Sequence, residues 1–275
     1  MDLRIQLNVS SKKNDQQKRT PQPSQNPPKT STNNSKHEDR AAAGKPVRNT
    51  LLRKIPADEF LALAPYLEPV EFHNAACLEE ADTRINAVYF LNGGMGSMIV
   101  ETDDGRSVEV GLAGHEDMIG LPLAAGLDES NYSVVMQVPG DGFRVSADSI
   151  RQILPNLPHL KRLLLRRLAI RFLEAAQNAA CNRLHAAKQR LARWLLLTHD
   201  RMDSDLIRTT HDFLSRMVGT DRPTVSLAVA ELERDGIIRT GRGAIRIENR
   251  RKLEQRSCEC YQHLRHFNGE LELRK

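Results

Sequence analysis

The chain has 275 residues, a formal net charge of +5 and four cysteines. Its length suffices for about two domains. No apolar run approaches the roughly 18–20 residues of a membrane span, and the first residues lack the continuous apolar core of a signal peptide. The scattered cysteines make no disulfide framework. We therefore expect a cytoplasmic protein without a membrane partner.

Charge of opposite sign is separated along the chain. Residues 1–48 carry a net charge of +6, residues 49–150 a net charge of −12 and residues 151–275 a net charge of +11. Such separation suggests segments with different partners, because a polyanion is attracted to a basic segment and repelled by an acidic one. The C-terminal part is the better candidate for binding nucleic acid.

Residues 1–48 are predicted to be a disordered basic leader. They are rich in Pro, Gln, Asn, Ser and Lys and show no apolar periodicity. Such a segment cannot bury enough apolar surface to offset the entropy lost on ordering. Its role stays open between a basic arm that follows DNA phosphates and a dispensable leader.

Residues 49–156 are expected to form a β-rich domain. A short amphipathic helix is predicted after Pro56, with Phe60 and Leu63 among its apolar positions. Short apolar or alternating stretches punctuated by Gly follow, and two of them flank Asp104-Gly105, which is a strong hairpin signal. Repeated short strands at this spacing favour a small β-barrel or roll over a parallel sheet.

Near Ser149 the apolar period changes from two to about 3.6, which predicts a long helix over residues 157–182. One narrow stripe runs for about five turns and contains Leu160, Leu164, Leu168, Phe172, Ala175 and Ala179. A stripe of this kind is typical of a helix that pairs with a copy of itself. The alternative is a helix that packs only on its own β-rich domain.

Two further short helical patterns are joined by a tight turn. Thr209 or Thr210 is placed to cap the first, and Gly219 permits the left-handed backbone that ends it. Asp221 is placed to cap the second, with Pro223 tolerated in its first turn. Two helices joined so tightly form a helix-turn-helix, whose second helix enters the major groove in DNA-binding versions.

A β-hairpin with a basic tip is predicted after the second helix. Residues 237–239 pair with residues 244–247 in this interpretation, and Arg239, Arg242 and Arg246 suit contacts with phosphates. The segment 183–250 is therefore predicted to be a winged helix-turn-helix domain.

The sequence FLSRMVGTDRPTVSLAVAELERDGIIRTGRGAIRI, preceded by the β-rich domain and the pairing helix, resembles the Crp/Fnr family of bacterial transcription regulators. The resemblance is strongest over residues 205–248, and AGHEDMIG is similar to a Gly-containing segment of the family. It implies an α+β fold with a double-stranded β-helix, which is a cyclic-nucleotide-binding-like jelly roll, a long dimerisation helix and a C-terminal winged helix-turn-helix. It also implies a homodimer on near-palindromic double-stranded DNA, with RNA polymerase as a further partner.

The resemblance also indicates which residues contact DNA. Arg222 falls where the family has an Arg that reads a guanine edge, and Thr210 and Thr224 fall at phosphate-contacting positions. Pro223 and Leu227 stand where the best-known members carry Glu and Arg, so the familiar operator is not assumed. The predicted DNA-binding residues are Thr210, His211, Asp221, Arg222, Pro223, Thr224, Ser226, Leu227, Arg239 and Arg242.

The β-rich domain lacks the residues by which family members hold a cyclic nucleotide. The resemblance implies a Gly-Glu pair for the ribose and an Arg about a dozen residues later for the phosphate. Here the pair is Gly120-Leu121, and no Lys or Arg occurs between Leu121 and Gly140. A phosphate would be left unneutralised, so no cyclic nucleotide is expected. A weak pocket for an unidentified effector would comprise Gly120, Leu121, Tyr132 and Ser133.

Other cofactors and catalytic motifs are not expected. No cysteine precedes Cys77, which argues against a clustered-thiolate iron–sulfur site. Cupin-type metal chemistry needs a His-x-His pair, but the β-rich region offers only His73 and His115. No nucleophile–base arrangement stands out, so the protein is predicted not to be an enzyme.

Residues 251–275 are expected to form a C-terminal tail. They carry four residues that could bind a metal, Cys258, Cys260, His263 and His266. Cys-x-Cys is not a standard structural-zinc spacing, so no metal is predicted.

Together these observations predict a sequence-specific DNA-binding transcription regulator. Two alternatives stay open: a DNA-binding dimer that needs no ligand, and a regulator switched by metal or redox chemistry at Cys258 and Cys260. The sequence leaves open the effector, the operator, and whether the protein activates or represses.

Overall fold

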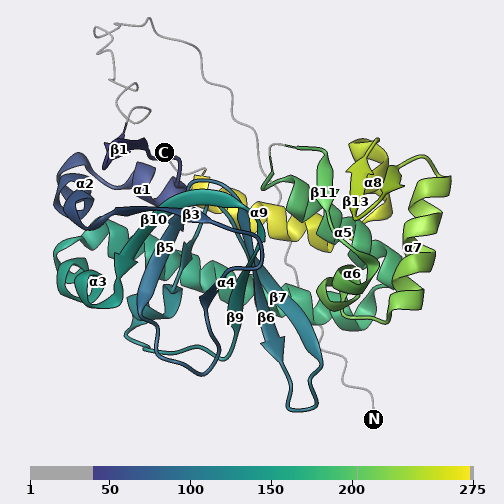
Figure 1. Cartoon of the computed structure of the whole chain (residues 1–275), viewed down its shortest axis with the longest axis horizontal. Coiled ribbons are helices and arrows are strands. Elements are labelled where there is room, and N and C mark those ends of the chain that lie inside the picture. The colour runs from purple at the N-terminus through teal and green to yellow at the C-terminus, as the bar shows by residue number, and fades with distance from the viewer. Residues whose placement is uncertain (1–39, 203, 273–275) are drawn as a thin grey trace, which may run out of the picture. The chain divides into compact units, whose positions relative to one another are not determined.

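The computed structural model describes residues 40–202 and 204–272, and their centre is a β-roll of two antiparallel sheets (Figure 1). The strand orders are β3-β10-β5-β8 and β4-β9-β6-β7. The strands are β3 (Glu68–Phe72), β4 (Cys77–Glu79), β5 (Ala87–Leu91), β6 (Met95–Glu101), β7 (Ser107–Ala113), β8 (Met118–Ile119), β9 (Ser133–Val138) and β10 (Gly140–Ser146). The expected α+β class with a jelly roll is confirmed.

Local turn chemistry sets the β6–β7 hairpin. Gly105 has φ +78°, and its N–H donates to the carbonyl of Thr102 at 2.8 Å. A left-handed residue at this point suits Gly, which has no Cβ to clash. The hairpin predicted at Asp104-Gly105 is thus present, and it projects from the roll (Figure 1).

Residues 40–48 fold with the β-roll. The short strands β1 (Ala41–Ala42) and β2 (Lys45–Pro46) pair, and Ala42 and Val47 are buried in the core that also holds Leu51. The domain therefore begins earlier than the expected boundary at residue 49, and residues 1–39 of the predicted leader lie outside the described residues. The segments that follow are α1 (Thr50–Lys54), α2 (Ala57–Leu63) and the 3-10 helix η1 (Ala64–Tyr66).

Helix α4 (Pro158–Leu184) follows η2 (Leu121–Ala125), α3 (Ala147–Ile153) and η3 (Leu154–Asn156) along the chain. Its first turn is capped from a distance. The buried carboxylate of Glu59 accepts from the N–H groups of His159 and Leu160 at 2.8 and 2.9 Å. These bonds satisfy donors that a helix start leaves unpaired, and a negative charge there is favourable.

The predicted apolar stripe of α4 divides between two surroundings. Leu160 and Leu164 are buried against the β-roll, whereas Phe172 is 73% exposed. The exposed apolar positions are Leu165, Ala169, Phe172, Leu173, Ala175, Ala176, Ala179, Ala180 and Leu184. We call this set the α4 seam. The stripe over residues 157–182 is therefore not one continuous pairing face, because the roll covers its first turns.

The C-terminal half forms a second group of elements (Figure 1). They are α5 (Ala187–His199), β11 (Leu206–Arg208), α6 (His211–Val218), α7 (Arg222–Arg234), β12 (Ile238–Gly241), β13 (Ala244–Ile247), α8 (Arg250–Arg256) and α9 (Cys260–Glu272). Trp194, Leu214, Val225 and Ile245 belong to its core, and Met95 of β6 packs in the same cluster. The β-roll and the C-terminal elements thus share buried surface.

The segment expected as a C-terminal tail is folded. Leu253 of α8 and Tyr261 and Leu264 of α9 are buried in the C-terminal core. Helix α9 packs along α4 and also contacts α5. Within the described residues, no helix is long and apolar enough to cross a membrane.

Candidate nucleic-acid interface

The turn between α6 and α7 is built by three local devices. The hydroxyl of Thr210 accepts from the N–H of Phe213 at 3.1 Å, which caps α6. Gly219 ends α6 with φ +67°, in the left-handed region. The carboxylate of Asp221 then accepts from the N–H of Thr224 at 2.8 Å, which caps α7. The structure therefore has the predicted helix-turn-helix geometry, with Thr210 rather than Thr209 as the first cap.

The start of α7 presents a basic and apolar tip to solvent. Arg222 and Pro223 are exposed, and Leu227 is 70% exposed, while Val225 and Ala228 of the same helix are buried. Arg222 forms no side-chain hydrogen bond or ion pair with any residue that the structure describes. A guanidinium held at the surface in this way keeps all five donors for another molecule.

Several of the predicted DNA-binding residues, among them His211, Asp221, Thr224 and Ser226, have partners inside the domain. Nδ1 of His211 lies 2.9 Å from the hydroxyl of Ser226, which donates to the carbonyl of Arg222 at 3.0 Å. The hydroxyl of Thr224 donates to Asp221 at 2.8 Å. These contacts join α6 to α7 and hold the first turn of α7, so they position the exposed tip.

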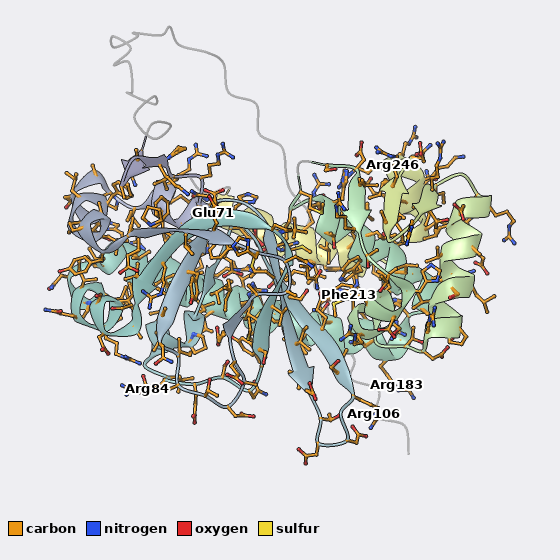
Figure 2. All side chains as sticks on the ribbon, in the orientation of Figure 1. Glu71, Arg84, Arg106, Arg183, Phe213 and Arg246 are labelled. Carbon is orange, nitrogen blue, oxygen red and sulfur yellow. The ribbon has the colours of Figure 1, made fainter. Side chains whose placement is uncertain are left out.

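A three-stranded sheet, in the order β11-β13-β12, forms the wing. Arg239 of β12 pairs in register with Arg246 of β13, and Arg208 of β11 pairs with Ala244. Because strand side chains alternate between faces, Arg208, Arg239 and Arg246 share the outer face, and all three are exposed. Figure 2 shows Arg246 at the surface.

Sequence reasoning did not find strand β11, and so missed Arg208. Its three residues are too few to show an alternating pattern. Arg242 lies in the turn between β12 and β13 and is exposed. Arg239 is paired with Glu248 at 3.1 Å, but an ion pair this exposed contributes little and can be exchanged for a phosphate.

Comparisons with known proteins agree with this geometry. Residues 189–256 match the family model for the Crp-like helix-turn-helix domain. A CRP-like cAMP-activated global transcriptional regulator from Mycobacterium tuberculosis is 24% identical over 219 residues, which cover 76% of this chain and 97% of the relative. The C-terminal part of the chain therefore carries a Crp-like helix-turn-helix domain, and most of the chain is similar to a transcription regulator. The relatives matched are transcription regulators.

Solved structures of other proteins show the same fold. FixK2 from Bradyrhizobium japonicum aligns with a TM-score of 0.60 at 18% identity, covering 70% of this chain and 98% of FixK2. CLP from Xanthomonas campestris, described as a c-di-GMP responsive global regulator, aligns with a TM-score of 0.55 at 18% identity, covering 69% of this chain and 96% of CLP.

The β6–β7 hairpin lies against the helix-turn-helix. Nε1 of Trp194 on α5 donates to the carboxylate of Glu109 on β7 at 3.1 Å. A Cβ at Gly219 would lie only 3.3 Å from Cγ2 of Val108. Burial raises the pKa of Glu109 to about 7, although hydrogen bonds from Ser97 and Trp194 oppose the shift. The β-roll thus contacts the DNA-binding turn directly.

A buried ionic network connects the β-roll to α4. Arg167 is fully buried and lies 2.9 Å from Asp117 and 3.2 Å from Glu174. Arg171 also bonds Asp117 and lies 3.4 Å from Glu174. Burial by itself would lower the pKa of Arg167. The neighbouring carboxylates of Asp117 and Glu174 outweigh it and hold this pKa above its usual range. Arg167 and Glu174 are not part of the predicted apolar stripe, yet both are buried.

The network extends to the C-terminal elements. Asn268 of α9 accepts from Arg167 at 2.9 Å and donates to Glu174 at 2.8 Å. Arg201 lies 2.8 Å from Glu116. That ion pair holds the pKa of Glu116 at about 2, below its usual value, against the opposite effect of burial.

The predicted effector pocket is partly filled by the chain itself. Leu121 is buried in the core of the roll, and the hydroxyl of Ser133 accepts from the N–H of Ala81 at 3.0 Å. The N–H of Gly120 donates to the carboxylate of Glu79 at 2.9 Å. Burial raises the pKa of Tyr132 above its usual value. These residues do lie in one region, but the Gly120 N–H, which an effector would need as a donor, is already bonded to Glu79.

The four candidate metal ligands of the tail are separated. Cys258 and Cys260 are buried, whereas His263 and His266 are exposed on α9. The two cysteines instead meet Cys181 and His185 from the end of α4. The hydrogen bond between Cys181 and Cys258 lowers the pKa of the Cys258 thiol to about 5 and raises that of Cys181, because the pair shares one proton.

Proposed function

We propose that this protein is a homodimeric, sequence-specific transcription regulator of the Crp/Fnr family that binds near-palindromic double-stranded DNA. The observation that carries the proposal is the tip of α7, where Arg222, Pro223 and Leu227 are exposed. A bidentate Arg contact with a guanine contributes roughly 1–3 kcal/mol of discrimination between bases. Leu227 offers an apolar surface that suits a thymine methyl group. The wing arginines supply contacts with phosphates, which position the helix without reading sequence.

The α4 seam supports the homodimer. Phe172 and Leu165 are seven residues apart, as are Phe172 and Ala179, which is the heptad spacing of paired helices. Exposed large apolar side chains in one line mark an interaction surface. A second copy would cover the seam and place two α7 helices on one duplex, with half-sites about 34 Å apart.

The interior of the β-roll supports control without a cyclic nucleotide. Glu79 occupies the Gly120 N–H and also accepts from Ser130 at 2.6 Å. Arg171, the cation that acts on Glu79, is itself held by Asp117 and Glu174. A phosphate entering here would meet a carboxylate and, among the residues that the structure describes, no uncommitted cation. Unlike its cAMP-activated relative, this protein is therefore proposed to bind DNA without that ligand.

Selection from random duplex DNA with the full chain tests the proposal. We expect a two-fold-symmetric motif, enriched equally with and without added cAMP. No enrichment of any sequence would contradict the proposed function, and enrichment that depends on cAMP would contradict the ligand-free part of it. Sedimentation of the free and DNA-bound protein supplies the stoichiometry, which we expect to be two chains per site.

A further inference from the structure

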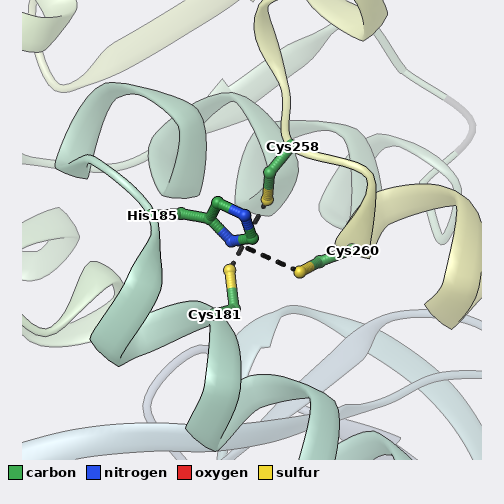
Figure 3. Close-up of side chains that lie close together, drawn as sticks. All are labelled: Cys181, His185, Cys258 and Cys260. Carbon is green, nitrogen blue, oxygen red and sulfur yellow. Dashed lines mark hydrogen bonds between the residues drawn. The ribbon is translucent and has the colours of Figure 1, made fainter. Parts of the chain in front are cut away.

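Three cysteines and one histidine meet where α4 ends and α5 begins. Cys181 and His185 come from the last turn of α4, and Cys258 and Cys260 flank the start of α9 (Figure 3). The three thiols are buried and His185 is half-buried. Because Cys258 precedes the helix while Cys260 opens it, the two sulfurs are not forced to opposite sides. Both sulfurs can therefore face the same ion.

The ligand atoms lie close enough together to surround a single ion. All four lie within 4.8 Å of one another. Sγ of Cys181 lies 3.5 Å from Sγ of Cys258, and Sγ of Cys260 lies 3.5 Å from Nδ1 of His185. Zinc bonds of about 2.3 Å to sulfur and 2.0–2.1 Å to nitrogen give tetrahedral edges of roughly 3.5–3.8 Å. An iron–sulfur cluster contains several iron atoms, so its thiolate ligands would have to lie further apart than these.

The imidazole is oriented as a ligand. Nδ1 of His185 faces the sulfurs, while Nε2 lies 3.1 Å from the carboxylate of Glu259. A carboxylate on the distal nitrogen is the usual outer partner of a metal-bound His, since it fixes the tautomer and raises the basicity of the ligand nitrogen. In addition, Nε2 of Gln177 lies 3.0 Å from Sγ of Cys260 and can donate to it.

Two buried cations lie beside the cluster. The side chains of Arg190 and Arg193 donate to Asn182 and Asn178 in the last turns of α4, next to Cys181. Neither forms an ion pair with a carboxylate in the part of the chain that the structure describes, and the Nε of each has no hydrogen-bond partner there. Buried cations need a compensating charge. A divalent ion with three thiolates and a neutral imidazole carries a charge of −1, and so offsets part of the positive charge of the two arginines.

We propose that Cys181, His185, Cys258 and Cys260 form a structural zinc site that fastens the start of α9 to the end of α4. Four protein ligands leave no open position, which distinguishes a structural ion from a catalytic one. Three thiolates select zinc over magnesium or calcium, which prefer oxygen. The site lies beside the His185–Ala186 break between α4 and α5, so the ion would also fix the direction in which α5 leaves α4.

The metal content of the purified full chain tests the site. We expect one zinc per chain by mass spectrometry, retained through dialysis and lost on treatment with a thiol-modifying mercurial. After the zinc is replaced by Co²⁺, we expect thiolate-to-metal charge-transfer absorption together with the visible bands of tetrahedral Co²⁺. Zinc-free protein whose Co²⁺ form lacks thiolate bands would overturn the proposal. A chromophore with acid-labile sulfide would overturn the mononuclear assignment.

Matched variants locate the ligands. Cys258→Ser and His185→Gln should each lower the zinc content at least tenfold, whereas Cys77→Ser should leave it unchanged, because Cys77 is exposed in the β-roll. If a variant does not fold, the Co²⁺ spectrum of the unaltered chain still decides. Retention of one zinc in both folded ligand variants would place the ion elsewhere and refute the assignment.

Discussion

Glu109 allows a quantitative prediction about the contact between the β6–β7 hairpin and α5. Burial raises its pKa to about 7 from an ordinary 4.5. The folded state therefore keeps a proton that the unfolded chain releases, so this contribution to stability is complete below pH 4.5 and is lost as the pH rises to about 7. A shift of about 2.5 units corresponds to roughly 3 kcal/mol at 1.36 kcal/mol per unit. Because Glu109 is not wholly buried, we expect a loss of about 1–3 kcal/mol.

The variant Glu109→Gln cannot ionise, and so isolates this contribution. Urea unfolding of both proteins from pH 5 to pH 8 measures it, with fluorescence of Trp194, the single tryptophan, as the probe. The free energy of unfolding of the parent chain should fall by about 1–3 kcal/mol more than that of the variant over this range. The other ionisable groups are common to both proteins, so their effects cancel in the comparison. Glu101→Gln, on the exposed end of β6, is the matched control. Parallel pH profiles for the parent chain and Glu109→Gln would refute the reasoning.

Three further predictions follow from the interface, the seam and the ionic network. Arg222→Ala should reduce the discrimination between bases at one position of the site by roughly 1–3 kcal/mol. Arg242→Ala should weaken binding to all DNA sequences alike and lower the slope of log affinity against log salt concentration by about one. Fluorescence anisotropy on single-base variants of the selected site measures both effects. Phe172→Glu should leave a monomer in sedimentation equilibrium, whereas Leu61→Glu, at an equally exposed leucine outside the α4 seam, should leave a dimer; a dimeric Phe172→Glu protein would disprove the role of the seam. Asp117→Asn removes one charge from a buried network and should lower the free energy of unfolding by about 3–5 kcal/mol; a change below 1 kcal/mol in urea unfolding would show that the network is dispensable.

Local signals of the sequence predicted the DNA-binding helices well. The caps at Thr210 and Asp221 and the left-handed Gly219 depend on residues within a few positions of one another, which a sequence pattern displays directly. The Asp104-Gly105 hairpin is of the same kind. These features need no knowledge of the rest of the fold.

Contacts between distant segments could not be predicted in this way. Cys181 and Cys258 are 77 residues apart, and Arg167 meets Asn268 across 101 residues. Helical periodicity shows that α4 has an apolar face, but not that charged residues on another face are buried by a helix from the C-terminal segment. The sequence therefore groups Cys258 and Cys260 with His263 and His266, which are near in sequence, whereas the structure brings the two cysteines to His185.

The packing of α9 on α4 has a consequence for the order in which the chain acquires its structure during synthesis. The ribosome makes the β-roll, α4 and the winged helix before it makes α9. Until Asn268 leaves the exit tunnel, Arg167 lacks one of its hydrogen-bond acceptors. Until Cys258 and Cys260 leave it, two of the four residues of the cysteine–histidine cluster are missing. A nascent chain can thus contain the whole helix-turn-helix, and its contact with the β6–β7 hairpin, before α9 is present. Translation of α9 then completes the contacts at the end of α4 after the winged helix itself has been made.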